Sequence, residues 1–180
     1  HTYGLYWGDV HRHTDVSNCR TGFDGCIVDH FRYAYDLGKI DFLGTSDHTD
    51  IGKIYHPYEW WHNQRMHDAL HSPGEFNTVY VYEREQRWPW GHRNIVFAQR
   101  DGPIVYIKRS FYLNSPWQKT LPVDPKGTAE ISPYELWDLL KSYGKPVAAL
   151  SHTGATGMGT DWKIYEKFDY SSENVVEIYQ

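Results

Sequence analysis

No run of about 18 apolar residues occurs in this sequence, so no segment is expected to cross a membrane as a helix. Basic residues are not in excess either: 18 Lys and Arg face 23 Asp and Glu, and the formal net charge is −5. This balance argues against nonspecific binding to nucleic acid. Internal repeats and low-complexity tracts are also absent. The 180 residues are predicted to form one domain, 1–180, which is large enough to bury a core.

Cysteine is scarce, and Cys19 and Cys26 are the only two. Six residues separate them, so a disulfide and a pair of free thiols are both open interpretations. The sequence begins with His1, a start that removal of an upstream export signal or a chosen boundary would each explain. Export is therefore one hypothesis for where the protein acts.

Aromatic residues are abundant, and Phe, Trp and Tyr together make up 17% of the chain. The simpler interpretation is a core and a surface rich in large amphipathic rings. A sharper alternative is a pocket lined with rings for a sugar or another planar ligand.

Hydrophobic patterning predicts strands that alternate with helices. Residues 27–37 have apolar side chains at helical spacing and stop at Gly38, and residues 134–143 follow an expected helix start at Ser132 and Pro133. Further elements are expected at 2–7, 40–44, 76–82, 94–98, 146–150 and 175–179 as strands, and at 58–70 as a helix. The alternation predicts an α/β fold with a parallel sheet or barrel, whose active groups lie at the C-terminal ends of the strands. Residues 101–129, which contain several prolines, are predicted to form a long loop or insertion.

Histidines and carboxylates gather where these strands end. His11 and His13 are two residues apart, so an extended chain would project both imidazoles from one face, an arrangement that suits a zinc, manganese or iron ion. Each such residue, taken alone, is explained by a hydrogen bond to a loop. The whole set favours metal ions, because buried charges need partners. Its other members are Asp47, His48, Glu83, Glu85, His92 and His152.

Five segments, in this order, carry a family resemblance: GDVHRHT, IDFLGTSDHTD, YVYERE, GHRNIVF and LSHTG. Together they resemble the PHP (polymerase and histidinol phosphatase) domain, and within it a branch known only as a domain of unknown function. The resemblance spans nearly the whole chain. It implies a distorted (β/α)7-type barrel with metal ions at the C-terminal face of its strands.

The resemblance also implies roles for individual residues. His11 and His13 would bind one metal ion, and His92 and His152 would bind a second. Glu83 would bridge the two, with Glu85 as the alternative bridging residue. His48 would bind a third ion or act as an acid/base beside it, and Asp47 would support catalysis by orienting a ligand imidazole.

Two features of the family are missing from this sequence. PHP domains end with an Asp-x-His that completes the metal cluster, so the C-terminal part of the barrel is expected to be missing here and a second chain or a further segment is expected to complete the site. Many also have a further histidine soon after the His-x-His, where this chain offers Asp15 or Cys19 as substitutes.

The expected function is that of a metal-dependent hydrolase, most simply a phosphoesterase, with two or three divalent transition metals (Zn, Mn or Fe) and a metal-bridging hydroxide as the nucleophile. The substrate would be a small anionic phosphoester, and Arg12 and Arg93 could contact its charge; a surface or structural ion pair is the alternative for each arginine. Two other functions stay open. One is amidohydrolase-like cleavage of a C–N or carboxylic ester bond, and the other is a non-catalytic subunit or fragment of a larger assembly.

Overall fold

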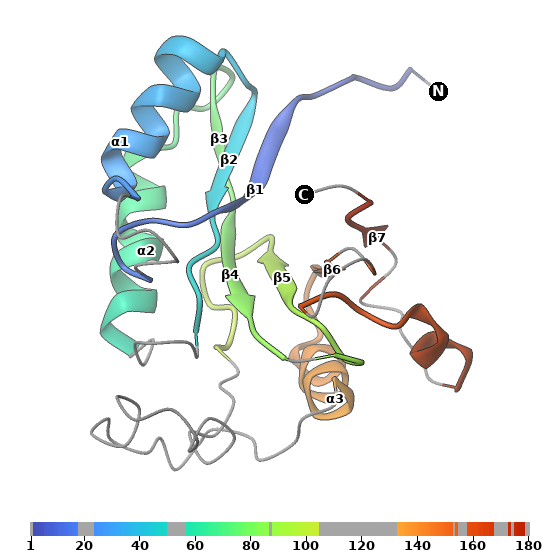
Figure 1. Ribbon diagram of the computed structural model, residues 1–180. Helices are drawn as coiled ribbons and strands as arrows, with labels where there is room; N and C mark the ends of the chain where they lie inside the picture. Colours follow the sequence, from blue (N-terminus) through green and yellow to red (C-terminus); the bar gives the residue numbers. More distant parts are fainter. Residues whose placement is uncertain are drawn as a thin grey trace.

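The structure, a computed structural model, describes residues 2–17, 24–49, 57–86, 88–104, 133–152, 154, 158–167, 173 and 175–178. These residues form a mixed α/β fold with two sheets (Figure 1). The α-helices are α1 (Ile27–Arg32), α2 (Pro57–Leu70) and α3 (Tyr134–Tyr143). The strands are β1 (Gly8–Arg12), β2 (Phe42–Thr45), β3 (Asn77–Thr78), β4 (Tyr80–Arg84), β5 (Arg93–Phe97), β6 (Val147–Ser151) and β7 (Val175–Val176). Within the described part of the chain, no helix is long and apolar enough to cross a membrane.

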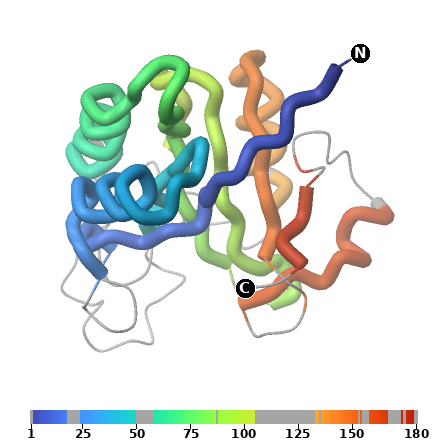
Figure 2. Tube along the Cα trace, turned by 90° about the horizontal axis from the view of Figure 1, so that it is seen from above, coloured from blue at the N-terminus to red at the C-terminus, as the bar shows by residue number. Residues whose placement is uncertain are grey.

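The first sheet contains three parallel strands in the order β1-β2-β3. Helices α1 and α2 lie together beside this sheet in both views (Figures 1 and 2). Ile27 and Phe31 of α1 pack with Leu43 of β2 and with Phe76 in one buried cluster. This burial supplies the main stabilisation of the first sheet.

The second sheet has the strand order β4-β5-β6-β7, with β5 antiparallel to both of its neighbours. Its core joins Tyr82 and Ile95 to Leu136 and Leu140 of α3. The two sheets meet where the continuation of β2 runs parallel to β4: His48 and Glu83 form a parallel bridge, and the Glu83 N–H donates to the Asp47 carbonyl over 3.0 Å. Strands of both sheets therefore share one edge, where the histidines described below lie.

Most of the expected elements are confirmed. The helices at 58–70 and 134–143 form as α2 and α3. The helix expected at 27–37 is present as α1 followed by a π-helical turn, Tyr33–Gly38, which ends at Lys39 in the left-handed conformation. Of the long loop expected at 101–129, residues 105–129 and the helix-start residue Ser132 lie outside the described residues.

Two expectations are wrong. The first strand is Gly8–Arg12 rather than 2–7, because backbone pairing with β2 begins only at Gly8. The sheets are not all parallel, because β5 runs antiparallel to β4. The connection from β4 to β5 spans only residues 85–92, which is too short for the crossover that a parallel pair requires. A closed barrel is not formed by the described residues.

Cys26 is a free thiol whose Sγ donates to Asp29 Oδ2 over 3.3 Å. Cys19 lies outside the described residues.

Candidate metal centre

The predicted histidines meet at one edge of the two sheets. His48 follows β2 and His152 follows β6, so both imidazoles lie at strand C-termini. His92 precedes β5 in the sequence, yet it reaches the same edge because β5 is antiparallel. The His152 N–H donates to the His92 carbonyl over 3.1 Å, which holds these two residues side by side.

A β-bulge positions the first pair of histidines. From Asp9 to Arg12, β1 advances three residues while β2 advances two from Leu43 to Thr45, so β1 contains one extra residue. The Asp9 side chain accepts the His11 N–H over 2.8 Å, so this backbone donor is satisfied at the bulge. The imidazoles of His11 and His13 then lie 5.3 Å apart between ring centroids.

Both oxygens of the Glu83 carboxylate face imidazole nitrogens. Oε1 lies 2.9 Å from Nδ1 of His92, 3.0 Å from Nε2 of His152 and 3.9 Å from Nε2 of His11. Glu83 is on β4 and is fully buried. One carboxylate oxygen thus faces three imidazoles, one on β1 and two in the segments beside β5 and β6.

The second oxygen faces the remaining two histidines. Oε2 of Glu83 lies 2.8 Å from Nδ1 of His48 and 3.3 Å from Nε2 of His13. These two rings stack with centroids 4.1 Å apart. Nδ1 of His48 also contacts Oε1 of Glu85, which is fully buried as well. Glu83 is therefore the central carboxylate, and Glu85 touches the cluster through one imidazole.

The local electrostatics keep the carboxylate ionised and two of the imidazoles neutral. Burial alone would raise the pKa of Glu83, but the charge of His48 and the neighbouring imidazole hydrogen bonds hold it well below the usual range. Burial lowers the pKa of His13 to about 3 and also lowers the pKa of His92. For His11, burial lowers the pKa, but the hydrogen bond with Glu177 and the charges of nearby carboxylates outweigh it, so the net shift is upward.

The donor set fits divalent transition metals. Within the described residues, every ion-pair partner of Glu83 is an imidazole, so no lysine or arginine neutralises this buried carboxylate. The Nδ1 atoms of His13 and His152 are buried with no hydrogen-bond partner in the described part of the chain. Neutral imidazole nitrogens around an anionic carboxylate are a favourable set for zinc, manganese or iron. Three groups have ligand atoms close enough to share an ion: His11, His13 and Glu83; His48, Glu83 and His92; and His11, His152 and Glu177.

Asp47 has different partners from those expected. Its carboxylate accepts from the N–H and hydroxyl of Thr14 over 2.7 and 2.8 Å, and from the hydroxyl of Ser17 over 2.8 Å. Burial raises the pKa of Asp47, and these hydrogen bonds oppose the rise. Asp47 thus fixes the loop that follows His13, and the described residues show no bond from its carboxylate to a ligand imidazole.

The two arginines differ in their surroundings. Arg12 is 53% exposed, with Nε 3.6 Å from Asp9, and remains accessible to an anion. Arg93 is fully buried, and its Nε bonds both oxygens of Glu173 over 3.0 and 2.8 Å. This ion pair favours the structural alternative for Arg93 over contact with a substrate.

The sequence analysis did not identify two residues of this region, Glu173 and Glu177. Nothing in the local sequence links Glu173 to Arg93. Glu177 follows the short strand β7 and bonds Nδ1 of His11 over 2.9 Å. Glu177 lies inside the strand expected at 175–179, so the rule that found the other residues at strand ends gave no signal for it.

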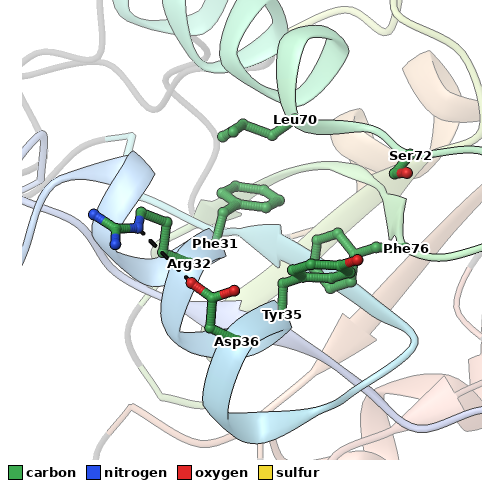
Figure 3. A pocket seen from close by; sticks show the side chains of 7 residues that line it. All are labelled: Phe31, Arg32, Tyr35, Asp36, Leu70, Ser72 and Phe76. Atoms are coloured by element: carbon green, nitrogen blue, oxygen red, sulfur yellow. Dashed lines mark ion pairs between the residues drawn. The ribbon is translucent and has the colours of Figure 1, made fainter.

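A separate pocket, lined by no residue of the histidine cluster, lies between α1, the π-helical turn, α2 and the segment before β3 (Figure 3). Phe31, Leu70 and Phe76 form most of its wall, and the ion pair of Arg32 and Asp36 lies at its side. The residues lining it include no histidine or cysteine. This pocket therefore shares no residue with the candidate ligand groups at the strand edge.

No protein-family model matches this chain, and a search of curated proteins and of solved structures found no match either.

Proposed function

We propose that this protein is a metal-dependent hydrolase whose substrates are phosphoesters, with a site of the PHP kind. The observation that carries the proposal is the meeting of five imidazoles around one fully buried carboxylate. Two of these six residues lie on β1 and β4, and the other four lie in segments that follow β1, β2 and β6 or precede β5. They are separated by up to 141 positions in the sequence. Buried packing alone does not favour such a set, because each polar group loses hydration and needs a partner.

In this proposal, His11 and His13 hold one cation, and His92 and His152 hold another. Glu83 lies between the two pairs: its Oε1 faces His92 and also His11, whereas its Oε2 faces His13. When bound, zinc, manganese or iron supplies activation of water near neutral pH and stabilises charge on a phosphoryl oxygen.

His48 is the proposed acid/base or the ligand of a third cation. Its Nδ1 lies between the carboxylates of Glu83 and Glu85, so both acids restrain the ring. Asp47 holds the adjacent loop in place through Thr14 and Ser17. Arg12, which is exposed, is the proposed contact for the anionic group of the substrate.

The test compares Glu83→Gln with His71→Ala, an exposed histidine outside the cluster. Each protein is stripped with a chelator, reloaded with zinc, manganese or iron, and analysed for metal content and for phosphate release from mono- and diesters. We expect the wild type and His71→Ala to bind metal and turn over substrate, and Glu83→Gln to lose both. Undiminished hydrolysis by metal-free wild type would contradict the proposal.

The same assay separates the other two functions. Cleavage of amides or carboxylic esters without any phosphate release would assign the site to amidohydrolase-like chemistry. Less than one tightly bound transition metal per chain after reloading would favour a non-catalytic subunit.

A further inference from the structure

The Glu177 carboxylate touches the His11 imidazole on the side away from Glu83. Its Oε1 lies 2.9 Å from Nδ1 of His11, in hydrogen-bond geometry, whereas Nε2 of the same ring faces Oε1 of Glu83 at 3.9 Å. The two ring nitrogens of His11 therefore have separate partners. An ionised carboxylate only accepts, so the proton of a neutral His11 belongs on Nδ1.

The backbone also fixes the place of Glu177. Its N–H donates to the Ser151 carbonyl over 2.9 Å, so the residue continues the pairing of β7 with β6. His152 follows Ser151 directly, and its ring lies 4.3 Å from that of His11 between centroids. One strand pair thus places His152 and the carboxylate of Glu177 against the same imidazole.

We infer that Glu177 is a positioning residue of the metal centre, which holds His11 in the Nδ1–H tautomer and leaves Nε2 as the coordinating atom. This inference rests on the proposed function, since it gives His11 a metal ion to bind. A carboxylate behind a ligand imidazole fixes the ring, raises its basicity, and is worth about 10- to 100-fold in metal affinity.

The experiment uses three variants: Glu177→Ala, Glu177→Gln and, as a control, Glu166→Ala, which removes an exposed carboxylate outside the cluster. Zinc affinity is measured by competition with a chelator. The tautomer of His11 is read from the ¹⁵N shifts of its ring in metal-free protein, with circular dichroism as a check on folding. Glutamine can still accept from Nδ1–H, so it separates the loss of charge from the loss of the hydrogen bond.

We expect Glu177→Ala to release the Nδ1–H tautomer and weaken zinc binding about 10- to 100-fold. Glu177→Gln should keep the tautomer and lose less affinity, and Glu166→Ala should match the wild type. Wild-type affinity in Glu177→Ala, or a wild-type His11 without a proton on Nδ1, would overturn the inference. So would an equal loss in the Gln and Ala variants with the tautomer kept, because that result makes Glu177 a direct ligand.

The failure of the proposed function has a different signature. If wild-type protein binds no zinc, the proposed function and the positioning role both fall, whatever the tautomer. If wild type binds zinc and Glu177→Ala binds it equally well, only the inference about Glu177 falls.

Discussion

Glu83 and Glu85 lie two residues apart at the end of β4, are both fully buried, and both contact Nδ1 of His48. They differ in reach, because Glu83 faces five imidazoles from both of its oxygens, whereas the contact of Glu85 with the cluster is to His48. We expect Glu83→Gln to retain no zinc after dialysis against a weak chelator and Glu85→Gln to retain most of it. Metal content by elemental analysis gives the result, and equal losses in the two variants would show that Glu83 is not the central ligand.

The sequence was sufficient to predict the cluster but not every residue's role. Six residues of the cluster each lie on or beside an apolar strand, so chain order and the positions of the strand ends were enough to predict that they meet. They are His11, His13, His48, Glu83, His92 and His152. Asp47 and Arg93 stand in similar places, but their roles depend on Ser17 and Glu173. Those partners are 30 and 80 residues away, and hydrophobic periodicity has no information about such pairings.

His67 on α2 is predicted to make the fold sensitive to acid. It is fully buried, its Nδ1 donates to the Asn63 carbonyl over 2.7 Å, and Nε2 accepts from the Thr45 N–H. Burial lowers its pKa to about 4, below the 6.5 of an exposed histidine. Between these values the unfolded chain binds more protons, so the contribution is fully present above pH 6.5 and is lost as the pH falls toward 4.

The measurement is the free energy of unfolding in urea between pH 7.5 and 4.5 for wild type and His67→Gln. The wild type should lose up to about 1.4 kcal/mol more per pH unit than the variant within this window. Parallel curves for the two proteins would show that His67 does not couple folding to protonation.

At the scale of elements, β5 shows that apolar patterning predicts where a strand lies but not the direction in which it pairs. Apolar residues predicted a strand at 94–98, and the structure has it at Arg93–Phe97. Its direction depends on the connection 85–92, whose length excludes a parallel crossover. Only the antiparallel direction places His92 at the strand edge that carries His152 and Glu83, so this one reversal completes the site.

Gly91 controls how β5 begins. Its φ is +71°, and a Cβ there would lie 2.2 Å from Oγ1 of Thr160 and 2.6 Å from the backbone of Gly159. Gly74 is a matched control, because its φ is +84° and a Cβ there would meet nothing within 4 Å. Each alanine variant should lose about 1–2 kcal/mol to the left-handed backbone.

Gly91→Ala should lose about 1–3 kcal/mol more, because its methyl group displaces the segment at Thr160. It should also weaken zinc binding by shifting His92, whereas Gly74→Ala should bind zinc as the wild type does. Urea unfolding and chelator competition measure both effects. Equal stability of the two variants would indicate that the segment at Thr160 yields without cost.

At the scale of the whole molecule, a buried polar network ties the second sheet to its surroundings. Glu173 accepts from Nε of Arg93 on β5, from Nε1 of Trp137 on α3 over 2.6 Å, and from the hydroxyl of Tyr165 on the 3₁₀ helix Trp162–Lys167. Burial raises the pKa of Tyr165 to about 12, so this hydroxyl keeps its proton as a donor. One carboxylate thereby joins a strand, an α-helix and a 3₁₀ helix.

Loss of this carboxylate is predicted to destabilise the fold more than it weakens metal binding, because Glu173 touches no residue of the cluster within the described part of the chain. Glu173→Gln leaves the Arg93 guanidinium buried without its counter-charge, which should cost about 3–5 kcal/mol of unfolding free energy. Asp101→Asn, which breaks the exposed pair with Lys145, should change stability far less.

In the double variant Arg93→Met/Glu173→Gln, part of the lost unfolding free energy should return, because no unpaired charge remains. Urea unfolding of the wild type, Glu173→Gln, Asp101→Asn and the double variant measures these free energies. A double variant less stable than Glu173→Gln would mean that Arg93 stabilises the fold through its carbonyl partners, Trp90 and Gly91, rather than through Glu173.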